Sequence, residues 1–489
     1  MLRKPGAFSP LIFSLLFRSS LPPVPDFATA MTQSYLALVN DNADLIAGDK
    51  GTGKTAIFQQ LKRNFANEPN LAGTEIVTGF NLAGEPLFRK LGTGQPLHEA
   101  QYITIWKMYI LSLAGNWLLN SSKGKRSGAL QKLDTLLAKL ELRSEDNNAT
   151  STFTNVLSWA RKLRPKIELS PDITSPILFK PSIEFYQSQS KDEIINPGEI
   201  SQGEAFTILD GALSEQKKSV WVVIDRLDEA FVGLPDVETP ALRALLRTYL
   251  DLMISDRLRL KLFVRKDLFR KIIKDGFVNL THVNARKFEI IWDDDDLLAL
   301  FAQRVRKSHE FIQMFGIVNA SDQDLFQMIF PEKMEARKNS PGTWKWILSQ
   351  LCDGNGIKSP RNLIDLMRLA QEEQLRREQR SPRKYGSEAP MIEIESLKKA
   401  CVRLSQRRIE DTLLAEYGGD VQRAIRAFKN GKSDHNISSL CRLFGFDEAL
   451  ALITAEVLNE IGFLEQADDI YRVPDLYLPG LNITHGKAF

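Results

Sequence analysis

Residues 44–61, DLIAGDKGTGKTAIFQQL, place an apolar run and three glycines directly before a stretch with helical periodicity. Within it, Gly48, Gly53, Lys54 and Thr55 satisfy the pattern G-x-x-x-x-G-K-[ST] of a phosphate-binding loop, or P-loop. Glycine lets the backbone wrap tightly enough for successive N–H groups to point at phosphate oxygens. The stretch therefore predicts a nucleotide site between a strand and a helix.

The flanking residues fit this context. ADLIA predicts a short buried strand, and TAIFQQLKRNF predicts a helix whose N-terminus adds a partial positive charge. We expect the Lys54 ammonium to meet the β- and γ-phosphates and the Thr55 hydroxyl to bind Mg²⁺. The predicted nucleotide-binding residues are Gly48, Asp49, Lys50, Gly51, Thr52, Gly53, Lys54, Thr55 and Ala56.

Composition sets broad limits. The chain has 489 residues, enough for two to four domains, and 64 basic against 61 acidic residues give no global argument for or against nucleic acid. The three cysteines are far apart, which suits a reducing compartment and forms neither a zinc nor a disulfide pattern. Residues 1–22 faintly resemble a signal peptide, but their apolar run ends at Arg18 and is too short to span a bilayer. We expect a cytoplasmic protein without a membrane partner.

The order of elements predicts an α/β fold: a parallel-sheet P-loop core with a helical domain and a C-terminal winged-helix-like domain. Strands alternate with helices up to about residue 294, and the pattern then becomes helical. FLEQADDIYRVP predicts a two-stranded hairpin near the C-terminus. The predicted division is an N-terminal extension, disordered, at 1–22; the core at 23–294 with a helical insertion at about 98–200; the helical domain at 295–380; a linker at 381–390; and the winged-helix-like domain at 391–489.

A second motif supplies carboxylates. VWVVIDRLDEAF places Asp225 at the carboxyl end of a buried strand, where open α/β sheets bind ligands. Asp225 is expected to hold Mg²⁺ together with Thr55, which is the Walker-B role. Asp228 and Glu229 follow on the turn, where either could act as the base for the attacking water. Both could instead cap the next helix.

Three arginines are candidates for stabilising the γ-phosphate charge. Arg265 ends the strand LRLKLFVR, Arg361 lies in the first turn of a helix at SPRNLIDLMRLA, and Arg286 follows in NARKF as a weaker candidate. Each could equally form a surface salt bridge, because arginine is common there.

These motifs carry a family likeness. GDKGTGKT, VVIDRLDE and SPRNLIDL, with the C-terminal hairpin, resemble the STAND/AAA+ side of the P-loop ATPases. DRLDE is close to the D-G-L-D-E Walker B of STAND proteins, with Arg226 where glycine is usual. ITIWKMYIL, FVRKDLF and YRVPDLYLPGL resemble a bacterial family of stand-alone P-loop ATPases over most of residues 25–485. The resemblance implies an ASCE-type fold, ATP as nucleotide, a sensor-2-like role for Arg361 and a link to defence against phage or mobile DNA.

Three function classes remain open on the sequence. The first is a slow ATPase acting as a nucleotide-driven switch, with an unknown protein partner or self-association. The second is a DNA-binding AAA+ ATPase of the initiator or loader type, in which a basic cluster would contact phosphates: Arg376, Arg377, Arg380, Arg383 and Lys384. A solvated linker explains the same cluster. The third, a small-molecule kinase, is disfavoured by the long helical region after the sheet.

Overall fold

A computed structural model describes residues 29–79, 97–122, 128–167, 202–227, 231, 235–274, 276–317, 319–335, 340–382 and 390–489. The chain divides into two compact units. The sheet unit comprises Ser34–Gly48 and Lys54–Glu289. The helical unit comprises Met1–Gln33, Asp49–Gly53 and Ile290–Phe489.

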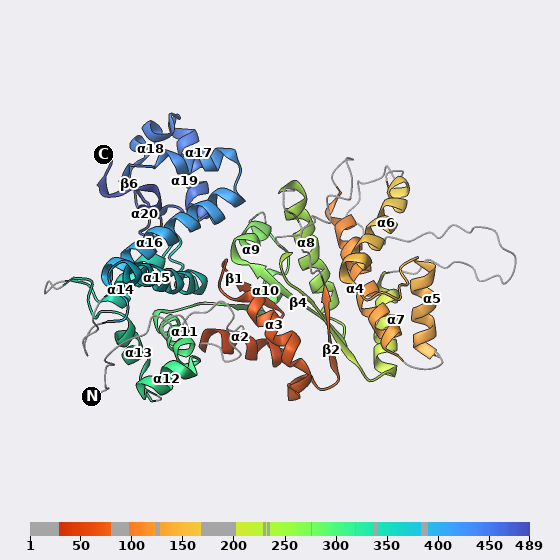
Figure 1. Ribbon diagram of the computed structural model, residues 1–489. Coiled ribbons are helices and arrows are strands. Elements are labelled where there is room, and N and C mark those ends of the chain that lie inside the picture. Colours follow the sequence, from red (N-terminus) through yellow and green to blue (C-terminus); the bar gives the residue numbers. More distant parts are fainter. Residues whose placement is uncertain are drawn as a thin grey trace. The chain divides into compact units, whose positions relative to one another are not determined.

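The sheet unit is built on five parallel strands in the order β2-β3-β4-β1-β5 (Figure 1). The strands are β1 Leu45–Gly48, β2 Thr74–Gly79, β3 Ser219–Ile224, β4 Leu258–Arg265 and β5 Lys287–Glu289. The central strands read as apolar runs because both faces of a parallel sheet are covered; every residue of β1 is buried. The predicted α/β P-loop fold is confirmed.

Helices surround this sheet. Helix α3 packs Ile57, Phe58 and Leu61 inward, as the periodicity predicted. The long helix α4 is buried on most sides and contacts α5, α6, α7 and α8, which explains why its sequence is apolar nearly all round. The helices are α2 Thr29–Val39, α3 Lys54–Asn64, α4 Glu99–Ser121, α5 Gly128–Lys139, α6 Ala149–Ile167, α7 Gln202–Glu215, α8 Pro235–Leu252, α9 Lys266–Ile273 and α10 Leu280–Ala285.

The helical unit has its own apolar core, which runs from α11 to the C-terminal strands. Helix α15 begins as the sequence predicted, with Ser359 as N-cap and Pro360 in the first turn, although the Ser359 side chain makes no capping hydrogen bond. The helices are α11 Asp294–Arg306, α12 His309–Phe315, α13 Asp322–Ile329, α14 Thr343–Leu351, α15 Pro360–Arg380, α16 Ile394–Arg408, α17 Gly419–Ala427, α18 Ile437–Phe444, α19 Glu448–Glu460 and α20 Leu478–Leu481.

A second, four-stranded sheet closes the chain in the order β7-β8-β6-β9. The predicted hairpin is confirmed as β7 Glu465–Ala467 paired antiparallel with β8 Ile470–Arg472. Strands β6 Lys432–His435 and β9 Thr484–Lys487 were not expected, because KSDH and THGK are polar and show no alternation. No helix among the described residues is long and apolar enough to cross a membrane.

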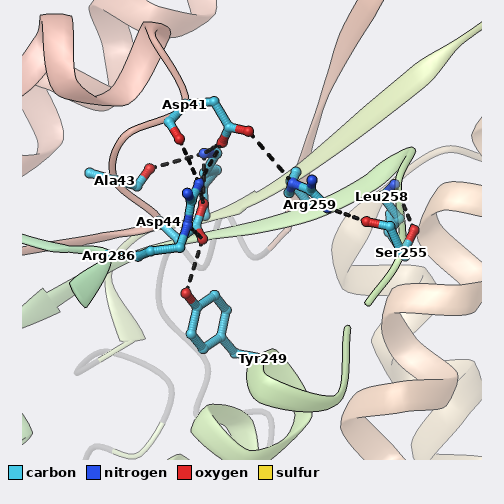
Figure 2. A network of polar contacts seen from close by, with 9 residues as sticks. Asp41, Ala43, Asp44, Tyr249, Ser255, Leu258, Arg259 and Arg286 are labelled. Atoms are coloured by element: carbon cyan, nitrogen blue, oxygen red, sulfur yellow. Dashed lines mark hydrogen bonds and ion pairs between the residues drawn. The ribbon is translucent and has the colours of Figure 1, made fainter. Parts of the chain in front are cut away.

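A buried charge cluster lies at the amino end of β1. Asp44 directly precedes the strand, and its carboxylate accepts hydrogen bonds from Lys261 Nζ at 2.7 Å, from the Tyr249 hydroxyl at 2.9 Å and from the Arg286 guanidinium. Figure 2 shows Asp44, Arg286 and Tyr249 converging, with Asp41 beside them. Burial alone would raise the pKa of Asp44, but the hydrogen bonds and charges of Arg286 and Lys261 outweigh it and hold that pKa below its ordinary value.

The cluster yields a stability prediction. Asp44→Asn leaves the fully buried Lys261 with a weaker partner, so the free energy of unfolding at pH 7 should fall by about 3 kcal/mol. The matched control Asp41→Asn removes a carboxylate that is 40% exposed and should cost at most about 1 kcal/mol. Urea unfolding measures both.

The pH dependence follows from the lowered pKa of Asp44. The unfolded state takes up this proton first, so the stabilisation is present above the unfolded value and is lost as pH falls through the folded pKa. The gap between wild type and Asp44→Asn should therefore begin to shrink below about pH 4. A gap that stays constant down to pH 2 would contradict the role given to the Asp44 charge.

Candidate functional site

The loop Asp49–Gly53 connects the carboxyl end of β1 to the first turn of α3. Gly51 and Gly53 have φ values of 81° and 105°, in the region where a side chain is strained. Thr52 is buried, and both its hydroxyl and its N–H donate to the Asp49 carbonyl, at 2.8 and 3.3 Å. The glycines of the motif thus serve a tight backbone turn, as the sequence predicted.

Lys54 opens helix α3. Its Nζ donates to the carbonyl of Gly48 at 2.7 Å, so the ammonium group lies back toward the last residue of β1. An anion in the loop would meet this charge together with the partial positive charge at the N-terminus of an eleven-residue helix. The arrangement can bind phosphate by backbone and charge alone.

Asp225 lies immediately after β3 and is 4% exposed. The Thr55 hydroxyl of α3 donates to its carboxylate. Burial raises the pKa of Asp225 above its ordinary value. The hydrogen bonds from Thr55 and the Arg226 backbone and the charges of Arg226 and Lys54 lower this pKa, but they do not outweigh burial. This contact links the first turn of α3 to the residue that follows β3.

The Asp225 carboxylate also holds an unsatisfied atom. Its Oδ2 is buried and has no hydrogen-bond partner among the described residues. A buried carboxylate oxygen without a partner is costly, which suggests a ligand that the protein does not itself supply. Hydroxyl and carboxylate oxygens are the ligands that Mg²⁺ prefers, so Thr55 and Asp225 fit that ion.

The predicted base residues Asp228 and Glu229 lie outside the described residues, and their roles stay predictions. A described residue of the same motif, Arg226, is informative. Arg226 has a φ of 58°, a left-handed conformation that glycine adopts without strain. This is the position at which the resembled Walker-B form carries glycine.

Arg265 and Arg286 lie at opposite ends of the sheet. Arg265 ends β4 on the same edge as the P-loop and binds Asp267 through two hydrogen bonds of 3.0 and 2.6 Å. Arg286 precedes β5, and its guanidinium is held by Asp41 and Asp44 at the amino end of β1. Four residues of extended strand, roughly 13 Å, separate that end from the P-loop. The weaker candidacy of Arg286 for the phosphate is therefore wrong.

Arg361 lies beside the P-loop backbone within the helical unit, to which Asp49–Gly53 also belongs. A Cβ placed on Gly51 would lie 2.5 Å from Ser359 Oγ and 3.1 Å from Arg361 Cβ. Gly51 therefore admits no side chain, both for its φ and for this close approach. The exposed Arg361 side chain starts next to the loop, while its role toward phosphate stays a prediction.

Two further contacts of the loop were not foreseen. Trp292 Nε1 donates to the Thr52 carbonyl at 2.9 Å, and Lys50 forms an ion pair with Glu416. Both partners lie far from the motif in sequence, and neither EIIW nor AEYG carries a signal that would identify them. Residues distant in sequence thus hold the P-loop at one backbone carbonyl and at the Lys50 side chain.

Comparisons with known proteins give structural likeness alone. No protein-family model matches the chain, and no curated protein matches it in sequence. Three solved structures are similar: the Aeropyrum pernix ORC1 protein in complex with DNA (11% identity, TM-score 0.37, 96% of this chain and 95% of that one), the Aeropyrum pernix ORC2 protein with ADPNP and ADP (11%, 0.41, 96% and 96%) and a Walker-type ATPase of Pyrococcus abyssi (12%, 0.39, 96% and 100%). Likenesses this weak assign no ligand, so function rests on the residues of this chain.

The Asp225 geometry predicts a magnesium-dependent effect. Asp225→Asn keeps the shape of the side chain but removes its charge, so ADP should raise the melting temperature equally with Mg²⁺ and with a chelator. In the wild type, Mg²⁺ should add to the shift. Thermal unfolding with both additions measures the difference.

A matched control exists in the same unit. Asp210 is another carboxyl whose pKa burial raises, and it is hydrogen-bonded to Ser255 Oγ at 2.6 Å. Asp210→Asn should retain the full Mg²⁺ effect. If Asp225→Asn also retains it, Asp225 does not serve the metal.

Proposed function

We propose that this chain is a Mg²⁺-dependent ATP-binding and ATP-hydrolysing P-loop protein that works as a nucleotide-driven conformational switch. The observation that carries the proposal is the contact of Thr55 with the buried Asp225, whose Oδ2 has no hydrogen-bond partner in the described part of the chain. Such a pair, next to a glycine loop and the first turn of a helix, matches the two-motif site that nucleoside triphosphates require.

Each residue has a separable task in this mechanism. Backbone N–H groups of Asp49–Gly53 and the Lys54 ammonium would bind the β- and γ-phosphates, and Thr55 with Asp225 would hold Mg²⁺. The ion, when bound, neutralises charge that develops on the phosphate oxygens. Asp228 or Glu229 would accept the proton of the attacking water.

The assignment to ATP and to the STAND type rests on the sequence likeness, with one supporting observation. Arg226 adopts the left-handed φ of 58° at the position of the glycine in D-G-L-D-E. The turn after Asp225 therefore has the left-handed conformation that glycine would adopt without strain, and Arg226 adopts it here although it carries a side chain. Cytoplasmic location, and a role in defence against phage or mobile DNA, remain parts of the same proposal.

The initiator-type alternative draws on the C-terminal region. Helices α17, α18 and α19 with β6, β7 and β8 follow one another in the order of a winged helix, a fold that often binds DNA. The basic cluster at the end of α15 favours it less, because Arg376 pairs with Glu373 and Arg377 with Glu393. Stimulation of phosphate release by duplex DNA would favour the alternative, and its absence would favour the switch.

The Lys54 charge provides the central test. Lys54→Ala should weaken ATP binding at least tenfold and remove phosphate release, because a charge-assisted bond to phosphate contributes about 1.5–3 kcal/mol. Isothermal titration and a phosphate-release assay measure the two effects. Lys62→Ala, an exposed lysine on the same helix, should change neither. Unchanged ATP affinity in a folded Lys54→Ala protein would remove the assignment.

Substitution of Arg361 provides a test of the proposed conformational switch. Because its side chain starts beside Gly51, a γ-phosphate would add a charge partner that ADP lacks. A non-hydrolysable ATP analogue should therefore protect residues 359–366 from hydrogen exchange more than ADP does. Arg361→Ala should erase this difference while ATP still binds, and Arg376→Ala on the same helix should keep it. Equal protection by both nucleotides in the wild type would leave Arg361 without a switching role.

A further inference from the structure

Exposed apolar side chains concentrate at the start of helix α19. Of the ten large hydrophobic residues that are exposed in the described part of the chain, four lie within eight consecutive positions. They are Phe446 at 40%, Leu450 at 45%, Leu452 at 37% and Ile453 at 57%. Single exposed apolar residues are ordinary, whereas a contiguous group is typical of an interaction site.

Helical geometry makes these residues one stripe. Leu450 and Ile453 are three positions apart and share a face of α19, and Phe446 lies just before the N-cap Asp447. The helix is already anchored by a different face, on which Ala451, Ala455 and Leu458 are buried. A helix that is apolar on two faces is normally covered on both. The outward face therefore lacks the cover that its composition requires.

The segment of chain that carries the stripe is acidic. Residues 443–471 contain no lysine, arginine or histidine. The same stretch carries seven carboxylates, all on exposed residues: Asp447, Glu448, Glu456, Glu460, Glu465, Asp468 and Asp469. Asp447 is used as the N-cap of α19, where it accepts from the Leu450 N–H at 2.8 Å. The stripe is thus an apolar centre within a negative rim.

Charge decides what can cover it. In a winged-helix reading, α19 would be the helix presented to the DNA groove, and the β7–β8 hairpin with Asp468 and Asp469 at its turn would be the wing. Duplex DNA must be met by lysine or arginine at its phosphates, and the charged residues of 443–471 are carboxylates only. A protein surface with an apolar centre and a basic rim would bury the stripe and match the rim.

We propose that the outward face of α19 is a docking site for a partner protein, which presents an amphipathic helix with apolar side chains at its centre and lysine or arginine at its edges. Leu450 and Ile453 supply anchors three positions apart on one helix face, which is the spacing used in helix–helix recognition, and Phe446 flanks them. The proposal stands independently of the nucleotide site and requires no ATP.

The test uses the full chain and a defined probe. A fluorescent 18-residue amphipathic peptide of leucine and lysine should bind the wild type, measured by anisotropy, more weakly as salt increases. The same peptide with glutamate in place of lysine should not bind. Ile453→Lys should weaken binding of the lysine peptide at least tenfold, because it removes an anchor and reverses the local charge. Leu450→Ala is a milder second variant, expected to weaken binding about threefold or more.

Ile254→Lys is the matched control, since Ile254 is 88% exposed and belongs to the sheet unit. It should leave peptide binding unchanged. Equal binding by Ile453→Lys and the wild type, or equal loss in Ile254→Lys, would overturn the proposal. Two other results would also overturn it. One is binding of duplex DNA by the wild type that Ile453→Lys abolishes. The other is a wild-type dimer that Ile453→Lys converts to a monomer, because the occupant of the site would then be a second copy of this chain.

Discussion

The carboxylate of Asp44 is the contact on which the sheet depends. It joins three strands, because Lys261 extends from the middle of β4, Arg286 directly precedes β5 and Asp44 itself leads into β1. Backbone bonds act in the same place: Asp44 N donates to the Arg286 carbonyl and Leu262 N to the Asp44 carbonyl, both at 2.8 Å. A slip of one strand would leave Lys261 buried without its counter-charge, which is a strong constraint on register.

That register places the chemistry at the other end of the sheet. With β1 fixed between β4 and β5, the P-loop follows the carboxyl end of β1. Asp225 follows the carboxyl end of β3, which lies on the other side of β4. The buried carboxylates of Asp44 and Asp225 differ in their hydrogen bonding and in the direction of their pKa shift. Asp44 is saturated with donors and has a lowered pKa, whereas Asp225 has a raised pKa and an oxygen without a partner. A carboxylate left unsatisfied in an otherwise satisfied sheet is typical of a ligand site.

What the sequence revealed depended on the range of each interaction. The P-loop, the strand before Asp225 and the cap at Ser359 are local patterns, in which a few neighbouring residues determine the backbone. The Asp44–Lys261 pair joins residues more than two hundred positions apart and leaves no trace in either segment. Arg286 was misjudged for the same reason, since an arginine next to a strand gives no sign of which end of the sheet it occupies. Strands β6 and β9 are polar and short, and they form through pairing: β6 pairs with β8 of the hairpin, and β9 pairs with β6.

The C-terminal region shows why an order of elements does not establish a ligand. Helices and strands in winged-helix order are compatible with DNA, and an overall charge near neutrality decides nothing. Local charge is more informative. Residues 443–471 are twenty-nine consecutive residues without lysine, arginine or histidine, and they include the exposed apolar stripe. Desolvating such a stripe is favourable, but only a partner that also neutralises the carboxylates avoids the repulsion at the rim. The chemistry of this surface therefore favours a basic protein helix over a nucleic acid, whatever nucleotide the sheet unit binds.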